Sequence, residues 1–314
     1  MTTPDSTSFS RRSFLRGSAA AAAAGAFAVP AFGIKPIGRA GQPRFPLSLA
    51  AYSFRGHFAF MKDKPQKPAD PAKPLDMFGF LDFCADLGIA GAELTSYFFK
   101  AGAGDDYFLA LKRHAFLRGV AISGTAVGNN FAHPEGGQRA REIADVKAWI
   151  DRAAVLGAPH IRVFAGQSKE IDAAASRKLC IAALEECCDY AGTKGIFLGV
   201  ENHGGIVAEA DGLLEIIKAV QSKWIGVNLD TGNFHTDDPY GDLAKCAPYA
   251  VNVQVKAEIQ SRGHQKEAAD YKRIAQILRD ANYQGYVALE YEAAGDPWKA
   301  VPDELAKLRD ALGA

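Results

Sequence analysis

The sequence predicts a closed (β/α)8 barrel, a TIM barrel that forms a single domain. Apolar runs typical of strands alternate eight times with stretches typical of helices, as expected for βα units around a parallel sheet. No G-x-G-x-x-G motif follows the first run, where an open dinucleotide-binding sheet would need one. With 314 residues, of which 48% are hydrophobic, the chain is long enough to bury one full-sized core.

Each expected strand is a short, mostly apolar run that is followed by a longer helix-like stretch. The expected strands are Leu47–Phe54, Gly91–Tyr97, Val120–Ala126, His160–Ala165, Ile196–His203, Ile225–Asp230, Val251–Glu258 and Tyr286–Glu292. The helix-like stretches lie near Leu75–Leu87, Asp106–Arg118, Gln138–Leu156, Asp172–Thr193, Glu209–Gln221, Tyr240–Cys246, Gln265–Ala281 and Trp298–Leu312.

Alternation within the strands indicates which side chains face the barrel interior. Successive strand residues point alternately to the helices and to the interior. In Val251–Glu258 the valines alternate with polar residues, so the polar residues are expected inside. The same reasoning places inside the barrel Glu93, Arg162, Glu201, Asp230, Gln254, Lys256 and Glu290. Most of them lie late in their strands, so we expect them at the carboxyl-end rim, where TIM-barrel active sites are built.

Three of these interior residues are carboxylates that would repel one another: Glu201, Asp230 and Glu290. A divalent cation is the simplest way to keep all three ionised. Ligation by oxygen suits Mn²⁺ or Mg²⁺ better than Zn²⁺, and we expect Mn²⁺. Gln254 is expected either as a neutral fourth ligand or as a hydrogen-bonded interior amide. Glu292 is the exposed alternative to Glu290, and Asp230 also begins a sequence suited to a turn.

Polar side chains near the rim are candidates for binding the oxygens of a substrate: Glu93, Arg162, His203, His235 and Lys256. Lys256 has two alternative roles, since it can hold a substrate oxygen or pair with a carboxylate. The alternative for the two histidines is a solvated position in a loop.

The loop after the first strand and a set of aromatic residues are also candidate parts of the site. Gly56–Pro74 is rich in proline and lysine, and it is expected either as a lid over the rim or as a disordered ornament. Six aromatic residues are expected either in the core or in an aromatic wall that contacts a sugar ring: Phe54, Tyr97, Phe98, Phe131, Phe234 and Trp298.

The amino terminus has the pattern of an export signal. Arg11 and Arg12 precede an Ala-rich apolar run and an A-x-A site, Ala26–Ala28. The run has about thirteen residues, short of the ~20 needed to span a bilayer. We predict a twin-arginine signal peptide at residues 1–28, a linker at 29–44 and the barrel at 45–314. The export machinery is then a partner, and the mature protein is periplasmic or extracellular.

Charge balance and cysteine content indicate which partners and which covalent links to expect. The 36 basic and 36 acidic residues balance, so no bulk charge attracts nucleic acid, and a small carbohydrate is the expected partner. The five cysteines form no C-x-x-C pair, which indicates buried thiols and not a disulfide framework. The late strands carry no glycine-rich phosphate cradle, which favours an unphosphorylated sugar or glycoside.

Four short sequences carry a resemblance to a known family: Val-Glu-Asn-His at Glu201, Leu-Asp-Thr-Gly at Asp230, the strand that ends at Lys256, and Leu-Glu-Tyr at Glu290. The chain resembles the xylose isomerase-like barrels, which include sugar isomerases, ketose epimerases, inosose dehydratase and endonuclease IV. In that family the corresponding strands carry Glu, Asp, His and Glu metal ligands. Two positions depart from the pattern.

Gln254 stands where the family has its strand-seven histidine. Asn233 replaces the histidine that follows the aspartate by three residues, with His235 two positions later. The seven histidines of the chain do not supply the zinc cluster of endonuclease IV at the matching strands, which excludes that nuclease activity.

The resemblance implies a metal-dependent isomerase or epimerase that moves a proton next to a carbonyl through an enediolate. The metal would polarise two substrate oxygens, and Glu201 and Glu290 would exchange the proton as base and acid. The first alternative is a lyase or hydratase that acts on keto-sugars or keto-glycosides through the same carbanion. The second alternative is a sugar-binding barrel without catalytic activity.

Overall fold

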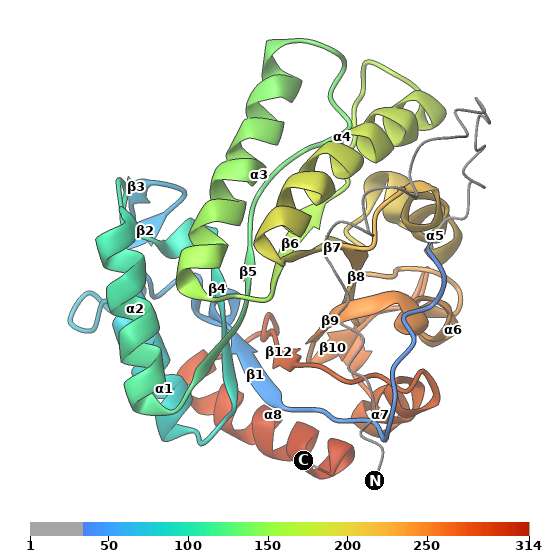
Figure 1. Ribbon diagram of the computed structural model, residues 1–314. Helices are drawn as coiled ribbons and strands as arrows, with labels where there is room; N and C mark the ends of the chain where they lie inside the picture. Colours follow the sequence, from blue (N-terminus) through green and yellow to red (C-terminus); the bar gives the residue numbers. More distant parts are fainter. Residues whose placement is uncertain (1–33, 314) are drawn as a thin grey trace, which may run out of the picture. The chain divides into compact units, whose positions relative to one another are not determined.

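The computed structural model describes residues 34–313, and the predicted signal peptide lies outside the described residues. Eight parallel strands form a closed barrel in the order β1-β12-β9-β8-β7-β6-β5-β4. β1 pairs with both β4 and β12, and these two pairings close the barrel. The helices surround the strands (Figure 1). The predicted (β/α)8 barrel is therefore confirmed.

The barrel strands begin close to the predicted positions and are mostly shorter than predicted. They are β1 (Leu47–Ala50), β4 (Gly91–Thr95), β5 (Ala121–Ala126), β6 (His160–Phe164), β7 (Phe197–Glu201), β8 (Ile225–Asp230), β9 (Ala250–Val255) and β12 (Val287–Leu289). β1 and β4 end early because the chain tightens into 3₁₀ turns, η1 (Ala51–Phe54) and η2 (Ser96–Phe98). Each turn brings one tyrosine to the mouth of the barrel, Tyr52 from η1 and Tyr97 from η2.

Each barrel strand is followed by a helix in the chain order. The helices are α1 (Met77–Asp86), α2 (Asp105–Arg118), α3 (Gly137–Leu156), α4 (Ala173–Lys194), α5 (Ala210–Ala219), α6 (Pro239–Cys246), α7 (Tyr271–Asp280) and α8 (Pro297–Leu312). Two further 3₁₀ turns are η3 (Gly205–Val207) and η4 (Ala247–Tyr249).

The stretch predicted as a helix over Gln265–Ala281 is helical only from Tyr271. Its first residues form β11 (Glu267–Ala268), which pairs with β10 (Glu258–Ile259). Asp270 then caps α7, because its side chain accepts a hydrogen bond from the backbone N–H of Arg273 at 3.0 Å.

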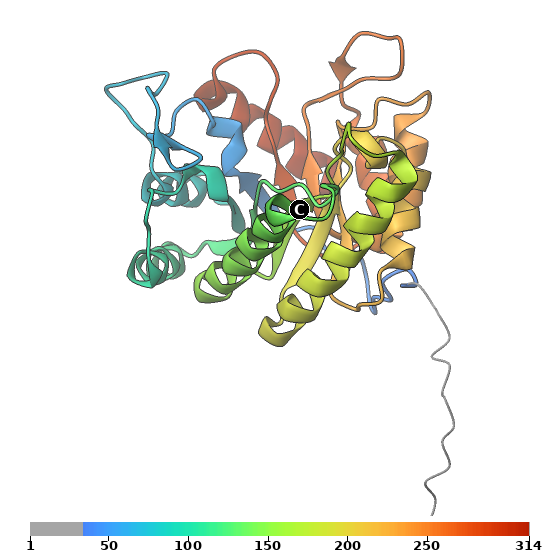
Figure 2. The ribbon, with the colours of Figure 1, turned by 90° about the horizontal axis from the view of Figure 1, so that it is seen from above.

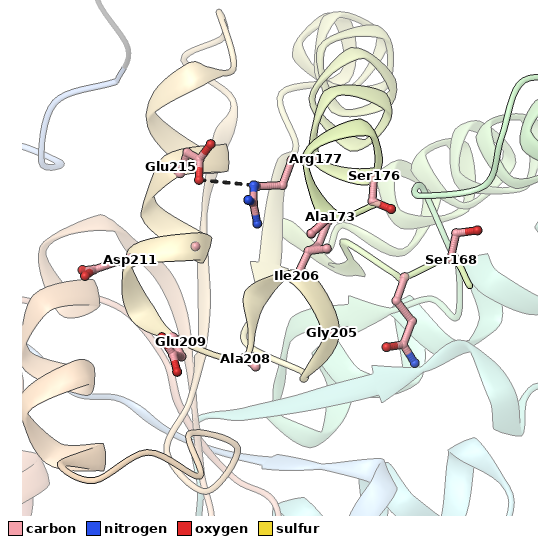
Figure 3. A pocket seen from close by; sticks show the side chains of 12 residues that line it. Ser168, Ala173, Ser176, Arg177, Gly205, Ile206, Ala208, Glu209, Asp211 and Glu215 are labelled. Atoms are coloured by element: carbon pink, nitrogen blue, oxygen red, sulfur yellow. Dashed lines mark ion pairs between the residues drawn. The ribbon is translucent and has the colours of Figure 1, made fainter. Parts of the chain in front are cut away.

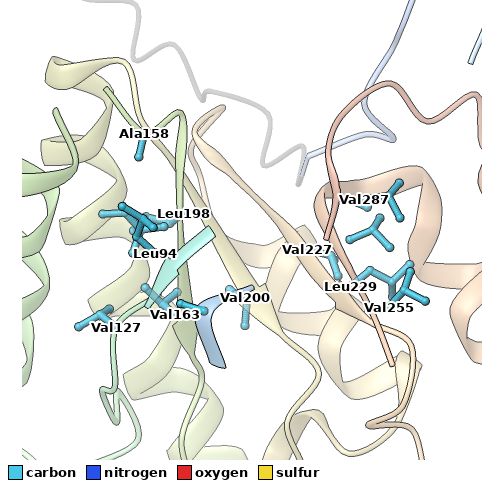
Figure 4. Packing of buried hydrophobic residues seen from close by; sticks show 14 of the residues in the cluster. Leu94, Val127, Ala158, Val163, Leu198, Val200, Val227, Leu229, Val255 and Val287 are labelled. Atoms are coloured by element: carbon cyan, nitrogen blue, oxygen red, sulfur yellow. The ribbon is translucent and has the colours of Figure 1, made fainter. Parts of the chain in front are cut away.

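The alternation of the strands separates an apolar shell from a polar interior. Outward-facing strand residues such as Leu94, Val163 and Val227 are fully buried against the helices (Figure 4). Inside the barrel, the hydroxyls of Ser48 and Ser123 lie 2.6 Å apart across the strands. The interior parity predicted from the sequence is therefore confirmed for the polar residues described below.

Residues 34–44, the described part of the predicted linker, run along the barrel. Arg44 forms a parallel bridge with Gln284, and the backbone N–H of Ile37 donates to the carbonyl of Pro248. The guanidinium of Arg39 donates to the carbonyl of Ala250. This segment is therefore attached to the barrel through hydrogen bonds.

Two excursions follow the carboxyl ends of strands and rise on the same side of the barrel (Figure 2). One is the hairpin of β2 (Phe60–Met61) and β3 (Lys64–Pro65) after β1, and the other is the β10–β11 ribbon after β9. Within residues 34–313, no helix is long and apolar enough to cross a membrane. All five cysteines are buried free thiols, as predicted.

Candidate functional site

A hollow of about 430 Å³ lies at the carboxyl-end mouth of the barrel. Its wall combines carboxylates, cations and aromatic rings from most of the strand ends. The lining residues are Tyr52, Met61, Lys62, Tyr97, Arg162, Phe164, Glu201, His203, Asn233, Lys256, Glu290 and Glu292. The size is within the ~300–1,000 Å³ typical of small-molecule pockets.

The ammonium of Lys256 is the centre of a cluster of carboxylates. Lys256 follows β9 directly, and its Nζ lies 3.2 Å from Oδ2 of Asp230 and 2.6 Å from Oε2 of Glu292. It also donates to Oε2 of Glu290. Of the two roles that the sequence left open for Lys256, the structure shows the pairing with carboxylates.

Burial and charge act together on the pKa values of this cluster. Burial would lower the pKa of Lys256, but the surrounding carboxylates, Asp230 first, raise it well above its ordinary value. Burial raises the pKa of Asp230 well above its ordinary value, and Lys256 only partly opposes this. Lys256 therefore remains protonated at neutral pH.

Glu201, at the end of β7, has its own set of partners. Its Oε2 pairs with Nε of Arg162 at 2.9 Å, and its Oε1 accepts a hydrogen bond from the Asn233 amide at 2.8 Å. Arg162 is held in turn by the carbonyl of Val127 at 3.0 Å. Burial raises the pKa of Glu201 above its ordinary value, although Arg162 acts in the opposite direction.

A closed ring of four buried side chains lies in the barrel interior. The Gln254 amide donates to Glu93 at 2.6 Å and accepts from Asn228 at 2.6 Å. Asn252 completes the ring, since its amide nitrogen lies 2.8 Å from both Glu93 and Asn228. Gln254 thus takes the hydrogen-bonded interior role, which was the second of its two predicted alternatives.

Glu93 was expected to contact substrate, and the structure places it elsewhere. The residue has no exposed surface, and each of its carboxylate oxygens accepts an amide hydrogen bond within the ring. It therefore lies beneath the hollow and does not line it. Nε2 of His160 lies 3.9 Å from Oε2 of Glu93. The His160 ring packs against Gly124, where a Cβ atom would lie only 2.0 Å from the ring.

The two predicted rim histidines line one hollow together with Asn233, and they differ in which further hollow they line. His203 lines the mouth hollow and its ring lies 4.6 Å from that of Phe164. His235 is exposed and lines an adjoining hollow of about 170 Å³, which also includes Lys256 and Glu292. Both histidines are therefore at the rim, but only His203 is in the hollow with the carboxylates.

The aromatic wall differs from the predicted one. Phe54, Phe98, Phe131 and Phe234 are core residues. Trp298 packs on Phe54 and donates to His57. Tyr97 alone of the predicted set lines the hollow, together with Tyr52 and Phe164, which the sequence analysis missed. Tyr52 lies where strand and 3₁₀ turn meet, so the alternation of a strand does not predict its direction.

The segment Gly56–Pro74, predicted as a lid or an ornament, forms the β2–β3 hairpin at the mouth. Met61 and Lys62 at its tip line the hollow. The backbone N–H of Lys62 donates to the carbonyl of Tyr97 at 2.7 Å, and its ammonium lies 4.7 Å from the centre of the Tyr97 ring. The hairpin therefore forms one wall of the hollow.

We tested whether the residues at the mouth fit a divalent cation. In the part of the chain that the structure describes, no three acidic, histidine or cysteine side chains surround one point at ligand distance, since Lys256 is between the carboxylates. The donors nevertheless fit in kind and charge. Oδ2 of Asp230 is buried without an aligned hydrogen bond. The site also contains four carboxyl groups, those of Glu201, Asp230, Glu290 and Glu292, beside the three cations Lys62, Arg162 and Lys256.

A larger hollow, of about 580 Å³, lies away from this chemistry, between the beginnings of α4 and α5. Its most prominent polar contact is the pair of Arg177 and Glu215, 3.2 Å apart (Figure 3). None of the predicted site residues lines it. We therefore assign the functional site to the barrel mouth, which contains the buried charges.

Comparison with known proteins identifies two regions of the chain. Residues 81–311 match the family described as xylose isomerase-like TIM barrel. Residues 8–28 match the signal sequence of the twin-arginine translocation pathway, which indicates export to the periplasm or the extracellular space. No curated protein matches the chain.

Several solved structures share the fold. D-psicose 3-epimerase, solved in the presence of D-fructose, superposes with a TM-score of 0.67 and 19% identity, over 86% of this chain and 100% of that one. 3-Keto-D-glucoside 4-epimerase from E. coli gives 0.64 and 15%, over 85% and 100%. A Mycobacterium smegmatis protein in complex with magnesium gives 0.64 and 21%, over 85% and 98%.

Proposed function

Because the chain belongs to the xylose isomerase-like TIM barrel family, we propose that it is a sugar isomerase or epimerase. In this proposal it removes a proton from a carbon next to a carbonyl group and returns a proton to the substrate. The substrate is an unphosphorylated sugar or glycoside, because the late strands carry no glycine-rich cradle for a phosphate group. The known activities of structural neighbours support the same chemistry.

One observation carries the proposal: two carboxylates from separate parts of the barrel share one hollow, each beside a cation. Glu201 ends β7 beside Arg162, and Glu290 follows β12 beside Lys256. Epimerisation by proton transfer needs a base on one face of the reacting carbon and a proton donor on the other face, whereas isomerisation can use a single base. The pair meets that need within one small-molecule pocket.

The chain's own residues have distinct tasks in this mechanism. Glu201 is the proposed base, since burial raises its pKa toward neutrality and thereby strengthens it as a proton acceptor. Glu290 is the proposed proton donor or acceptor for the second transfer. Lys256, protonated throughout, holds a substrate oxygen, and Arg162 and His203 hold others. Tyr52, Tyr97 and Phe164 provide an apolar surface and displace water.

A divalent cation, with Mn²⁺ or Mg²⁺ as the preferred ions, is part of the proposal. Glu201, Asp230 and Glu290 would hold it. Gln254 is a proposed neutral fourth partner through its amide oxygen, which accepts one hydrogen bond, from Asn228, and has a second lone pair. When bound, such an ion makes a proton next to a carbonyl more acidic and stabilises the negative charge that follows.

The test is carbon-bound proton exchange. Candidate sugars and keto-glycosides are incubated with Mn²⁺-loaded enzyme in D₂O and read by NMR after the metal is removed. The proposal predicts deuterium incorporation and a product of unchanged formula. An unsaturated sugar with a released alcohol or water would instead establish the lyase alternative. Binding without exchange for every sugar would establish the non-catalytic alternative.

Glu201→Gln and Glu290→Gln should each lower the exchange rate at least 10²-fold, because each variant keeps the shape of the side chain and removes the proton acceptor. Glu304→Gln, at a carboxylate that instead accepts a hydrogen bond from Tyr271, is the matched control and should exchange normally. Exchange at the wild-type rate in Glu201→Gln would contradict its role as base.

A further inference from the structure

A second hollow, of about 540 Å³, adjoins the one at the barrel mouth. The two share three lining residues, Lys62, Tyr97 and Phe164. A ligand held at the carboxylates can therefore extend past these residues into the second hollow. Each hollow by itself exceeds the ~300 Å³ at which small-molecule pockets begin.

The tip of the β2–β3 hairpin forms part of the shared wall. Lys62 and Asp63 have φ angles of 49° and 63°, because a two-residue loop between the paired residues Met61 and Lys64 favours a turn with positive φ at both central positions. This turn places Lys62 over the Tyr97 ring, between the two hollows.

One face of α3 forms the far wall of the second hollow. A different face of α3, which includes Ile143, Val146 and Ile150, is apolar and packs on the barrel. The stripe that lines the second hollow has helical spacing but is polar and aromatic, and it consists of Glu142, Asp145, Ala148, Trp149 and Arg152.

The charges of the second hollow nearly cancel. Lys62 and Arg152 oppose Asp63, Glu142 and Asp145, so the hollow has no attraction for phosphate. Among residues 34–313, no ion pair involves Arg152 or Asp145, whereas Glu142 is engaged by Asn130. Donors and acceptors beside the aromatic rings of Tyr97 and Phe164 suit a neutral ring with hydroxyl groups, which has both polar edges and an apolar face.

We propose that this second hollow binds a further neutral sugar ring, so that the substrate class is a two-ring glycoside and not a free monosaccharide. The inference rests on the proposed function for the identity of the reacting ring. It assigns the reacting ring to the carboxylates and the second ring to the α3 stripe. Lys62, Tyr97 and Phe164 then enclose the bond between the two rings.

The test blocks the second hollow without touching the first. Ala148 is exposed and lines the second hollow only, so Ala148→Trp fills it. Ala144 is exposed one turn earlier on α3 and lies outside the hollow, so Ala144→Trp is the matched control. The probes are 3-keto-trehalose, with two rings, and methyl 3-keto-α-D-glucopyranoside, with one. Both are followed by deuterium exchange and by calorimetric titration.

The wild type and Ala144→Trp should prefer the two-ring probe at least tenfold in kcat/KM, and Ala148→Trp should lose that preference. Asp145→Ala, which adds no bulk, should reduce the preference about fivefold. Equal use of both probes by the wild type, or an unchanged preference in Ala148→Trp, would overturn the second-ring site and leave the proposed function intact.

Calorimetry separates the two proposals when no exchange occurs. Absence of exchange with every probe would count against the proposed function. In that case, two-ring binding that is weakened tenfold by Ala148→Trp, and not by Ala144→Trp, still supports the second-ring site. No binding preference for the two-ring probe would overturn it.

Discussion

Lys256 is the residue on which the charge balance of the site depends. It is 7% exposed and contacts three carboxylates. Removing one partner of a buried charge cluster leaves the others uncompensated, which typically costs about 3–5 kcal/mol. A divalent cation would neutralise the same carboxylates. The ammonium and the ion would therefore both compensate the charge of the same carboxylates.

This balance predicts the behaviour of Lys256→Met. In EDTA its free energy of unfolding should fall by about 3 kcal/mol, and millimolar Mn²⁺ should restore much of the loss, as measured by urea denaturation. Lys266→Met, at a side chain that is 57% exposed, is the control and should change little in either condition. Unchanged stability of Lys256→Met in EDTA would show that the carboxylates do not need this cation.

The pKa shifts of Glu93 and His160 change the free energy of unfolding in opposite directions as the pH changes. Burial raises the pKa of Glu93 to about 7, so its contribution to stability is present below its unfolded pKa and is lost as the pH rises toward 7. Burial lowers the pKa of His160 to about 4, so its contribution is present above its unfolded pKa and is lost as the pH falls toward 4. The two slopes oppose each other between about pH 4.5 and 6.5.

We predict that Glu93→Gln and His160→Phe each remove one of these two contributions to the pH dependence of stability. From pH 7 to pH 4, Glu93→Gln should lose about 3 kcal/mol of unfolding free energy relative to the wild type, because the variant lacks the opposing contribution of Glu93. Over the same range His160→Phe should instead gain about 3 kcal/mol relative to the wild type, because the variant lacks the contribution of His160. Urea denaturation at several pH values measures both. Equal slopes in the two variants would contradict the assignment.

At the scale of the element, the predicted helices begin within two residues of the observed ones, except for α7. The start of α7 shows what the sequence pattern does not contain. Apolar spacing extends the helical pattern back to Gln265, but β11 pairs with β10 and fixes residues 267–268 as a strand. Only then does Asp270 begin the helix. Pairing with a strand ten residues earlier is a tertiary contact that local periodicity does not contain.

Asp270→Ala should lower the free energy of unfolding by about 1 kcal/mol, because the first turn of α7 loses the side chain that accepts from the Arg273 N–H. Lys272→Ala, at an exposed position in the same turn, is the control and should stay within about 0.5 kcal/mol. Chemical denaturation followed by circular dichroism measures both variants. Equal losses in the two would remove the capping argument.

At the scale of the molecule, strand parity predicted which side chains enter the barrel, because parity depends only on the alternation of a single strand. It did not predict the depth of each residue. Glu93 and Gln254 lie in the interior ring, whereas Lys256, two residues after Gln254, reaches the mouth. Depth depends on how neighbouring strands are staggered, and that is set only when the barrel closes.

The partners of the interior residues also depended on the whole barrel. Lys256 contacts Asp230 after β8, and Glu290 and Glu292 after β12, which are separate regions of the chain. The hairpin wall is a similar case, since Lys62 meets Tyr97 only because β1 and β4 are neighbours in the barrel. The sequence identifies these residues, but which of them are in contact depends on how the barrel closes.

The whole protein has to leave the cytoplasm, because residues 8–28 match a twin-arginine signal; these residues lie outside those that the structure describes. The twin-arginine pathway transports folded proteins. This suits a barrel whose buried carboxylates are expected to bind a metal ion before export. The receptor recognises the paired arginines, so Arg11→Lys combined with Arg12→Lys should leave the uncleaved precursor in the cytoplasm. Arg16→Lys keeps the pair and the net charge of the signal region and should still be exported. Cell fractionation followed by immunoblotting measures the distribution, and normal export of the double variant would refute the twin-arginine route.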